Sequence, residues 1–336
     1  MRGRTAALSG WLLLVGAAGA AGAAGAQPSP PVPVPGDASG STLQEVQVVG
    51  EQPGPGLWKV TKGAHVLWLL GTLDHVPKGM TWRSRQVQAA IGSSQQVLAN
   101  APAVSASLNP VLLFRLYFQW RGLQKDPDRT RLRDWLPAAL YARFEALKAR
   151  YDPHDARIEE LRPPFAALRL YRRALDAAGL TRDNEIDRAV IELARRHDVP
   201  VVRASVRVGD PLGTLKQLRA LSPALEVDCL ATTVQRLESD LPLMQARARA
   251  WAVGDIAQLR SLPYPNQLEA CVTALSAAPD VKALVRSAAD AWMSAAESAL
   301  DKDRVSFAIR PIYELLAPNG PLARFRAEGY LVEDPR

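Results

Sequence analysis

The sequence has few of the residues that bind metal ions or act as nucleophiles. Only four of its 336 residues are histidines, His65, His75, His154 and His197, so no histidine follows residue 197. No H-E-x-x-H, G-x-S-x-G, P-loop or G-x-G-x-x-G pattern occurs. These absences argue against a zincin, a serine hydrolase with a nucleophile elbow, a P-loop enzyme and a dinucleotide-binding enzyme.

Long hydrophobic runs are also missing, apart from a short one near the start. Arg2 and Arg4 precede an apolar run at residues 11–16, and Ala24 and Ala26 flank Gly25 in a small-residue cleavage site. We therefore predict that residues 1–26 are a signal peptide, with no retained membrane span and no lipoprotein cysteine after the cleavage site. The protein is then periplasmic or secreted.

Positive charge is present but not concentrated. The formal net charge is +7, and the arginines are scattered over segments with a helical pattern. A nucleic-acid interface needs lysine and arginine clustered with aromatic residues. We therefore expect no nucleic-acid partner.

Two cysteines, Cys229 and Cys271, are all that the chain contains. In an exported protein, two cysteines predict one disulfide, and two buried free thiols are the alternative. Residues 27–56 are rich in proline and glycine and predict a linker with one short strand. A single large domain is expected from residue 57 to residue 336.

The most informative stretch is residues 57–82, LWKVTKGAHVLWLLGTLDHVPKGMTW. Residues 66–70 are an unbroken apolar run, which is typical of a strand buried on both faces. Gly71 and Thr72 end it, and a loop follows. In open α/β sheets ligands bind where strands end, so chemistry is expected at residues 71–77.

The LWKV and GTLDHVPKG segments resemble the first motif of the TraB/GumN family, which is related to the Tiki-type metal-dependent proteases. The family pattern is Gly-Thr-x-His, and here Asp74 stands at the histidine position, with His75 one residue later. Asn100 stands where the family strand ends in an acid. The late strand leads into Arg310 and Glu314, where the family has a second Gly-x-x-His.

The fold expected from pattern and resemblance is α/β. N-terminal and C-terminal strands form a central sheet, and a large helical insertion occupies about residues 110–300. Within it, residues 111–120, VLLFRLYFQW, predict a helix buried in the core. Thr181 is a predicted N-cap for the helix that follows.

For the site, the polar residues at predicted strand ends form a candidate ligand-binding set. Its members are Gly71, Thr72, Asp74, His75, Arg203, Arg310 and Glu314. Asp74 and His75 are also the weak candidates for catalysis and for metal binding, although neighbours in an extended loop point in opposite directions. Alternatively, the charged residues are an ion pair that remains after a metal site was lost.

The sequence therefore predicts a protein without a cofactor that acts by binding an envelope protein or a peptide. The alternative, implied by the resemblance, is a metal-dependent hydrolase or peptidase using zinc or manganese. A role with envelope polysaccharide is suggested only by the GumN part of the family name.

Overall fold

The computed structural model describes residues 55–80, 82, 84–106, 109–181, 184–262, 271 and 276–335, all within the unit Val49–Arg336. The predicted signal peptide and nearly all of the predicted linker lie outside the described residues. After residue 55, the longest stretches that are not described are residues 263–270 and 272–275, on either side of Cys271.

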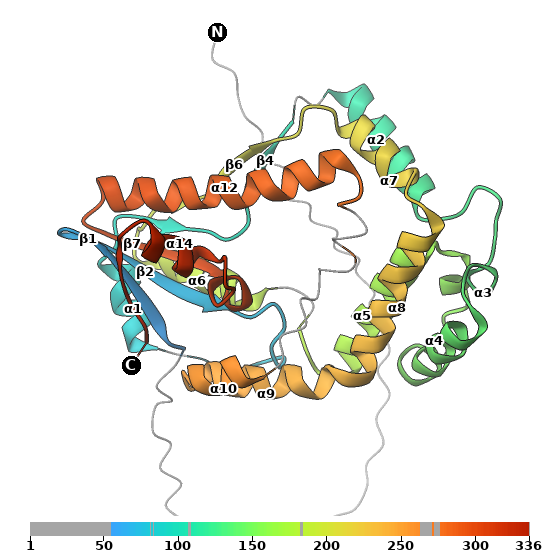
Figure 1. The fold of residues 1–336 in the computed structure, drawn as a ribbon, viewed down its shortest axis with the longest axis horizontal. Coiled ribbons are helices and arrows are strands. Elements are labelled where there is room, and N and C mark those ends of the chain that lie inside the picture. The colour runs from blue at the N-terminus through green and yellow to red at the C-terminus, as the bar shows by residue number, and fades with distance from the viewer. Residues whose placement is uncertain are drawn as a thin grey trace, which may run out of the picture. The chain divides into compact units, whose positions relative to one another are not determined.

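A six-stranded mixed sheet is the centre of the fold, as Figure 1 shows. Its order is β5–β3–β7–β2–β1–β8. The strands are β1 (Leu57–Lys62), β2 (His65–Thr72), β3 (Val97–Leu98), β5 (Val201–Val202), β7 (Val305–Pro311) and β8 (Leu331–Glu333). The α/β fold and the joining of early and late strands in one sheet are therefore confirmed.

The β2–β7 pair defines the edge of the sheet at which the parallel strands have their carboxyl ends. These two strands are parallel, with Leu70 opposite Ile309 and Gly71 opposite Arg310. β3 and β5 run parallel to them, so four strands have their carboxyl ends at the same edge. β2 and β7 consist mainly of apolar residues, because both faces of this part of the sheet are covered.

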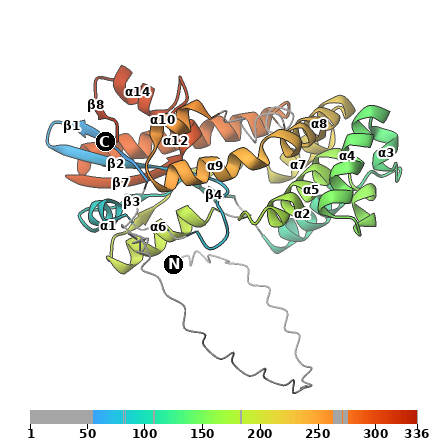
Figure 2. The same ribbon diagram turned by 90° about the horizontal axis from the view of Figure 1, so that it is seen from below.

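Helices cover both faces of the sheet. In both views α12 (Pro279–Lys302) lies on one side, while α1 (Arg85–Gly92) and α6 (Glu185–Arg196) lie on the other (Figures 1 and 2). Further helices, α9 (Leu241–Ala252), α10 (Ile256–Ser261), α13 (Ile312–Leu315) and α14 (Pro321–Ala327), complete the core around the strands. Its large buried side chains include Trp58, Trp251, Trp292 and Phe307.

A separate hydrophobic core holds much of the helical insertion together. It is built from α3 (Leu132–Trp135), α4 (Ala138–Tyr151), the short 3-10 helix η1 (Ala156–Glu160), α5 (Pro163–Ala177) and α8 (Pro223–Ser239), with Phe144 and Leu170 fully buried. A small parallel pair, β4 (Ala103–Ser105) and β6 (Ser205–Arg207), lies at the boundaries of the insertion.

The helix that contains residues 111–120 contradicts a prediction. Residues 111–120 are helical, within α2 (Pro110–Leu123), but they are not buried. Phe114 is 64% exposed and Val111 is 68% exposed. The reason is that α2 packs through one face on α7 (Pro211–Arg219), which leaves large side chains on the opposite face exposed.

The predicted disulfide between Cys229 and Cys271 is confirmed. It joins the middle of α8 to residue 271, which lies 42 positions further along the chain. A disulfide is compatible with an exported protein, because such bonds persist in oxidising compartments. None of the helices in the described part of the chain has the length and apolar character needed to cross a bilayer.

Candidate functional site

The polar side chains at the carboxyl edge of the sheet come from three strands. Thr72 is the last residue of β2, and Asp74 follows it by two positions. Asn100 follows β3 by two positions, and Arg310 lies near the end of β7. Gly71 permits a close approach here, because a Cβ on it would lie 2.8 Å from the side chain of Ile312.

The loop after β2 is fixed by the segment that precedes α6. The amide of Val76 donates to Oγ1 of Thr181 at 3.1 Å, and the amide of Thr181 donates to the carbonyl of Val76 at 2.8 Å. His75 Nδ1 lies 2.9 Å from the carbonyl of Thr181, so Nδ1 carries the proton that it donates. Thr181 therefore holds the site loop. The prediction that it caps α6 is wrong, because the N-cap is Asn184.

Asp187 is a site residue that the sequence analysis missed. It lies in the first turn of α6, where its amide donates to the Asn184 side chain at 3.1 Å. Burial raises the pKa of Asp187 to about 6, hydrogen bonding from Thr72 and Asn100 opposes this, and the charge of Asp74 adds to it. Burial also raises the pKa of Asp74. Two neighbouring carboxylates thus share the strand ends.

Two buried oxygens in this group remain without a well-formed hydrogen bond among the described residues. They are Oγ1 of Thr72 and Oδ1 of Asp187. Thr72 and Asn100 approach the Asp187 carboxylate closely enough to favour its charged form. These contacts still leave Oγ1 of Thr72 and Oδ1 of Asp187 without a well-formed hydrogen bond. Orphaned buried polar atoms are rare in proteins, and they are often found at sites of function.

Arg310 supplies the positive charge at this edge. Its Nη1 donates to Oδ1 of Asn100 at 3.2 Å, and its Nη2 contacts Oε2 of Glu314 at 2.5 Å. The guanidinium also lies over the ring of Trp292, at 5.1 Å from the ring centre. Its Nε is buried and has no hydrogen-bond partner in the described structure.

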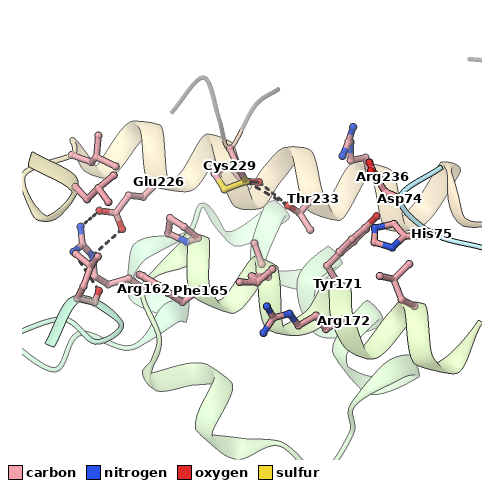
Figure 3. A pocket seen from close by; sticks show the side chains of 18 of the residues that line it. Asp74, His75, Arg162, Phe165, Tyr171, Arg172, Glu226, Cys229, Thr233 and Arg236 are labelled. Carbon is pink, nitrogen blue, oxygen red and sulfur yellow. Dashed lines mark hydrogen bonds and ion pairs between the residues drawn. A yellow bond between two sulfur atoms is a disulfide. The ribbon is translucent and has the colours of Figure 1, made fainter. Parts of the chain in front are cut away.

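A cavity of about 600 Å³ opens next to these strand ends, between α5 and α8. Figure 3 shows Asp74 and His75 at one end of it and the pair Arg162 and Glu226 at the other. Its walls are mainly apolar and aromatic, with Trp120, Leu123, Phe165, Leu168, Tyr171, Leu175, Leu218 and Tyr313. A volume of this size suits a drug-sized ligand.

The structure brings only part of the predicted ligand set to this cavity. Asp74, His75 and Glu314 line it, together with Asn100. Gly71, Thr72 and Arg310 lie at the same strand ends without lining the cavity. Arg203 lies exposed between β5 and β6 and does not line the cavity.

The opposite end of the cavity holds a buried ion pair. Arg162 donates through Nε to Oε2 of Glu226 at 3.1 Å, and its Nη2 bonds the other carboxylate oxygen. The same guanidinium also bonds the carbonyls of Leu123 and Arg219. The pair thereby fixes α5 against α8 and against the ends of α2 and α7.

The donor set at the strand ends does not fit a metal centre. No group of three histidine, cysteine, aspartate or glutamate side chains converges within the described residues, and Asp74 and Asp187 are the two carboxylates whose charges interact there. Nδ1 of His75 bonds the carbonyl of Thr181, so only its Nε2 could bind a metal ion, and Asn100 accepts from Arg310. A zinc site needs at least three protein ligands.

A comparison with protein-family models gives one match. The model of the TraB/PrgY/gumN family matches residues 56–334. Neither a curated protein nor a solved structure matches the chain.

Proposed function

This chain belongs to the TraB/PrgY/gumN family, and on that premise we propose that it is an exported, non-catalytic member that binds a ligand in the cavity beside the strand ends. The single observation that carries the proposal is Arg310. A permanent cation, held by Asn100 and Glu314, stands at the edge where the family resemblance leads us to expect a metal ligand.

The charge at this edge supports binding rather than metal chemistry. Asp74 and Asp187 supply two carboxylates, and Arg310, which is paired with Glu314, supplies a positive charge at the end of the neighbouring strand. An arginine side chain remains protonated at any physiological pH and binds no metal ion. It therefore opposes the approach of a second cation.

The lining of the cavity defines the class of ligand. Apolar and aromatic side chains form most of the wall, and the carboxylates of Asp74 and Glu314 lie at one end. A ligand with an apolar body and an uncharged, hydrogen-bond-donating end complements this arrangement. An apolar peptide segment from an envelope protein has both properties, and the disulfide supports an oxidising compartment as its location.

A metal-dependent hydrolase of the TraB/Tiki type is the second candidate. It is favoured by the pair Asp74 and Asp187, because neighbouring carboxylates with raised pKa values are typical of acid–base sites. The two proposals differ in whether these carboxylates take up a metal ion.

Elemental analysis of the purified protein, grown with zinc and manganese supplied, tests the proposal. We expect no stoichiometric metal in the wild type or in the Asp74→Ala/His75→Ala and Asp74→Ala/Asp187→Ala variants. One metal ion per chain that is lost in these variants would overturn the proposal and would justify a peptidase screen.

Binding of a neutral apolar fluorophore tests the cavity itself. We expect saturable binding by the wild type and at least about tenfold weaker binding by Thr233→Trp, which fills the cavity. The matched control is Ala189→Trp, which adds the same side chain on the exposed face of α6. Equal binding by both variants would show that the cavity is not the site.

A further inference from the structure

The exposed side of α2 carries an unusual number of large apolar side chains. We call the α2 face the set of residues that are at least 45% exposed there: Val111, Leu113, Phe114, Tyr117, Phe118 and Trp120. Single exposed apolar residues are common, but a contiguous set of this kind marks an interaction surface.

The helical geometry makes the α2 face continuous. Positions 111, 114 and 118 form one row along the helix, and positions 113, 117 and 120 form the next. The rings of Phe114 and Phe118 lie 4.5 Å apart, and those of Tyr117 and Phe118 lie 5.3 Å apart. α2 packs against α7 (Figures 1 and 2), and Leu123 is the residue of α2 that is buried.

The charged residues within α2 and within its neighbour α7 are all basic. α2 contains Arg115 and Arg121, and the adjacent α7 contains Lys216 and Arg219. Neither helix contains an acidic residue. The guanidinium of Arg121 lies over the ring of Tyr117, so a basic group lies within the aromatic surface.

We propose that the α2 face docks on an anionic membrane surface. A helix with exposed tryptophan, tyrosine and phenylalanine beside arginine and lysine matches the two layers of such a surface. The rings enter the boundary between head groups and acyl chains, and the cations bind lipid phosphates. The helix lies on the membrane and does not cross it.

The same charges argue against a second copy of this chain as the partner. A two-fold interface brings each surface against itself. Arg115 and Arg121 of one copy would then face basic residues of the other, and like charges in contact destabilise a complex. An anionic lipid surface removes this conflict.

The α2 face continues into the cavity. Trp120 is 46% exposed and also lines the cavity, where its ring meets that of Phe165 edge to face at 5.7 Å. A protein that docks through this face therefore presents one wall of the cavity to the membrane. The docking itself does not depend on the ligand proposed above.

Vesicle sedimentation tests the proposal. The probes are vesicles of roughly one part phosphatidylglycerol to three parts phosphatidylethanolamine, and vesicles of phosphatidylcholine alone. The variant is Val111→Gln/Phe114→Gln/Phe118→Gln, which changes only exposed side chains. The control is Val253→Gln/Leu331→Gln, which removes exposed apolar side chains from other elements. The full chain and a chain beginning at Gln27 are tested in parallel, so that binding by residues 11–16 is recognised.

We expect the wild type and the control to bind the anionic vesicles, and the triple variant to bind about tenfold more weakly or less. Binding should weaken between about 0.1 M and about 0.5 M salt, because the phosphate contacts are screened. Circular dichroism shows whether the triple variant is folded. A folded triple variant that binds like the control overturns the proposal.

Two further outcomes also overturn it. One is failure of the chain beginning at Gln27 to bind anionic vesicles. The other is a wild-type dimer in light scattering that the triple variant dissociates, because the α2 face would then join two copies. Fluorophore binding by the triple variant shows separately whether the cavity is intact.

Discussion

One group of charges lies at one end of the cavity and another lies at the strand ends next to its other end, and the two groups are satisfied to different degrees. Arg162 and Glu226 have side chains that are 8% and 1% exposed, and the guanidinium bonds both carboxylate oxygens and two carbonyls. At the strand ends, Asp74 and Asp187 carry the same charge, and Oδ1 of Asp187 has no described partner. Figure 3 shows the Arg162–Glu226 pair at one end of the cavity and Asp74 at the other.

This difference separates a structural role from a functional one. A buried pair that is fully bonded holds its elements in place, and removing one partner leaves a charge without solvent. Two like charges at a strand edge destabilise the fold and persist where they serve a site. The carboxylate group is therefore the end of the cavity where we place ligand recognition.

The largest effect is expected from breaking the satisfied pair. Arg162→Met leaves the Glu226 carboxylate buried without its partner, so we expect the free energy of unfolding to fall by about 3 to 5 kcal/mol. Urea denaturation at pH 7 measures it. The double variant Arg162→Met/Glu226→Leu should recover most of this loss, because an apolar pair replaces the charged one. Equal losses in both variants would mean that the backbone contacts of Arg162 dominate.

A change of opposite sign is expected at the strand ends. Asp187→Asn removes a carboxylate whose pKa is raised from 3.8 to about 6, so it should stabilise the protein above pH 6 by up to about 3 kcal/mol. In the wild type the folded state binds more protons than the unfolded state between about pH 4 and pH 6. Stability therefore falls as the pH rises through this window.

The pH profile makes this prediction specific. Denaturation from pH 4 to pH 8 should show a slope in the wild type that is smaller in Asp187→Asn, where Asp74, whose pKa burial also raises, still contributes. Asp74→Asn should move the remaining slope to lower pH, because it removes the neighbouring charge. Parallel pH profiles of stability for the wild type and Asp187→Asn would show that folding does not raise the pKa of Asp187.

The smallest effect is expected from a salt bridge on the surface. Arg143 bonds both oxygens of Glu238, at 3.0 and 2.6 Å, but the two side chains are 47% and 37% exposed. Solvent and salt screen such a pair, so Arg143→Gln should change the free energy of unfolding by less than about 1 kcal/mol. A loss near that of Arg162→Met would show that burial does not explain the difference between the pairs.

The sequence predicted the sheet because the local pattern had only one solution there. The run at residues 66–70 is apolar at every position, which requires a strand covered on both faces, and β2 is that strand. The late strand that leads into Arg310 was also predicted, and β7 covers Val305–Pro311. The disulfide could be predicted because two cysteines permit only one pairing.

The burial of α2 could not be predicted in this way. Its apolar and aromatic residues indicate that a surface avoids water, but they do not indicate which partner covers it. The sequence analysis assigned that partner to the core. In the structure the helix has α7 on one side and the exposed α2 face on the other.

Asp187 was missed because its place in the first turn of a helix has a local explanation that does not involve the strand ends. An acid in the first turn of a helix is explained by the helix dipole alone, so the sequence around Asp187 does not point to a site. A second signal was available. A helix that leads into a parallel strand starts near the carboxyl edge of the sheet, so an acid in its first turn faces the strand ends.

The β2–β7 pairing also determines the order in which the chain can fold. These strands join residues 66–72 to residues 305–311, so the centre of the sheet cannot form until almost the whole chain has left the ribosome. The core of α3, α4, α5 and α8 uses residues 132–244 alone and can pack earlier. The strand-end site therefore assembles late in folding, and a chain truncated before residue 305 lacks its Arg310 and its central strand pair.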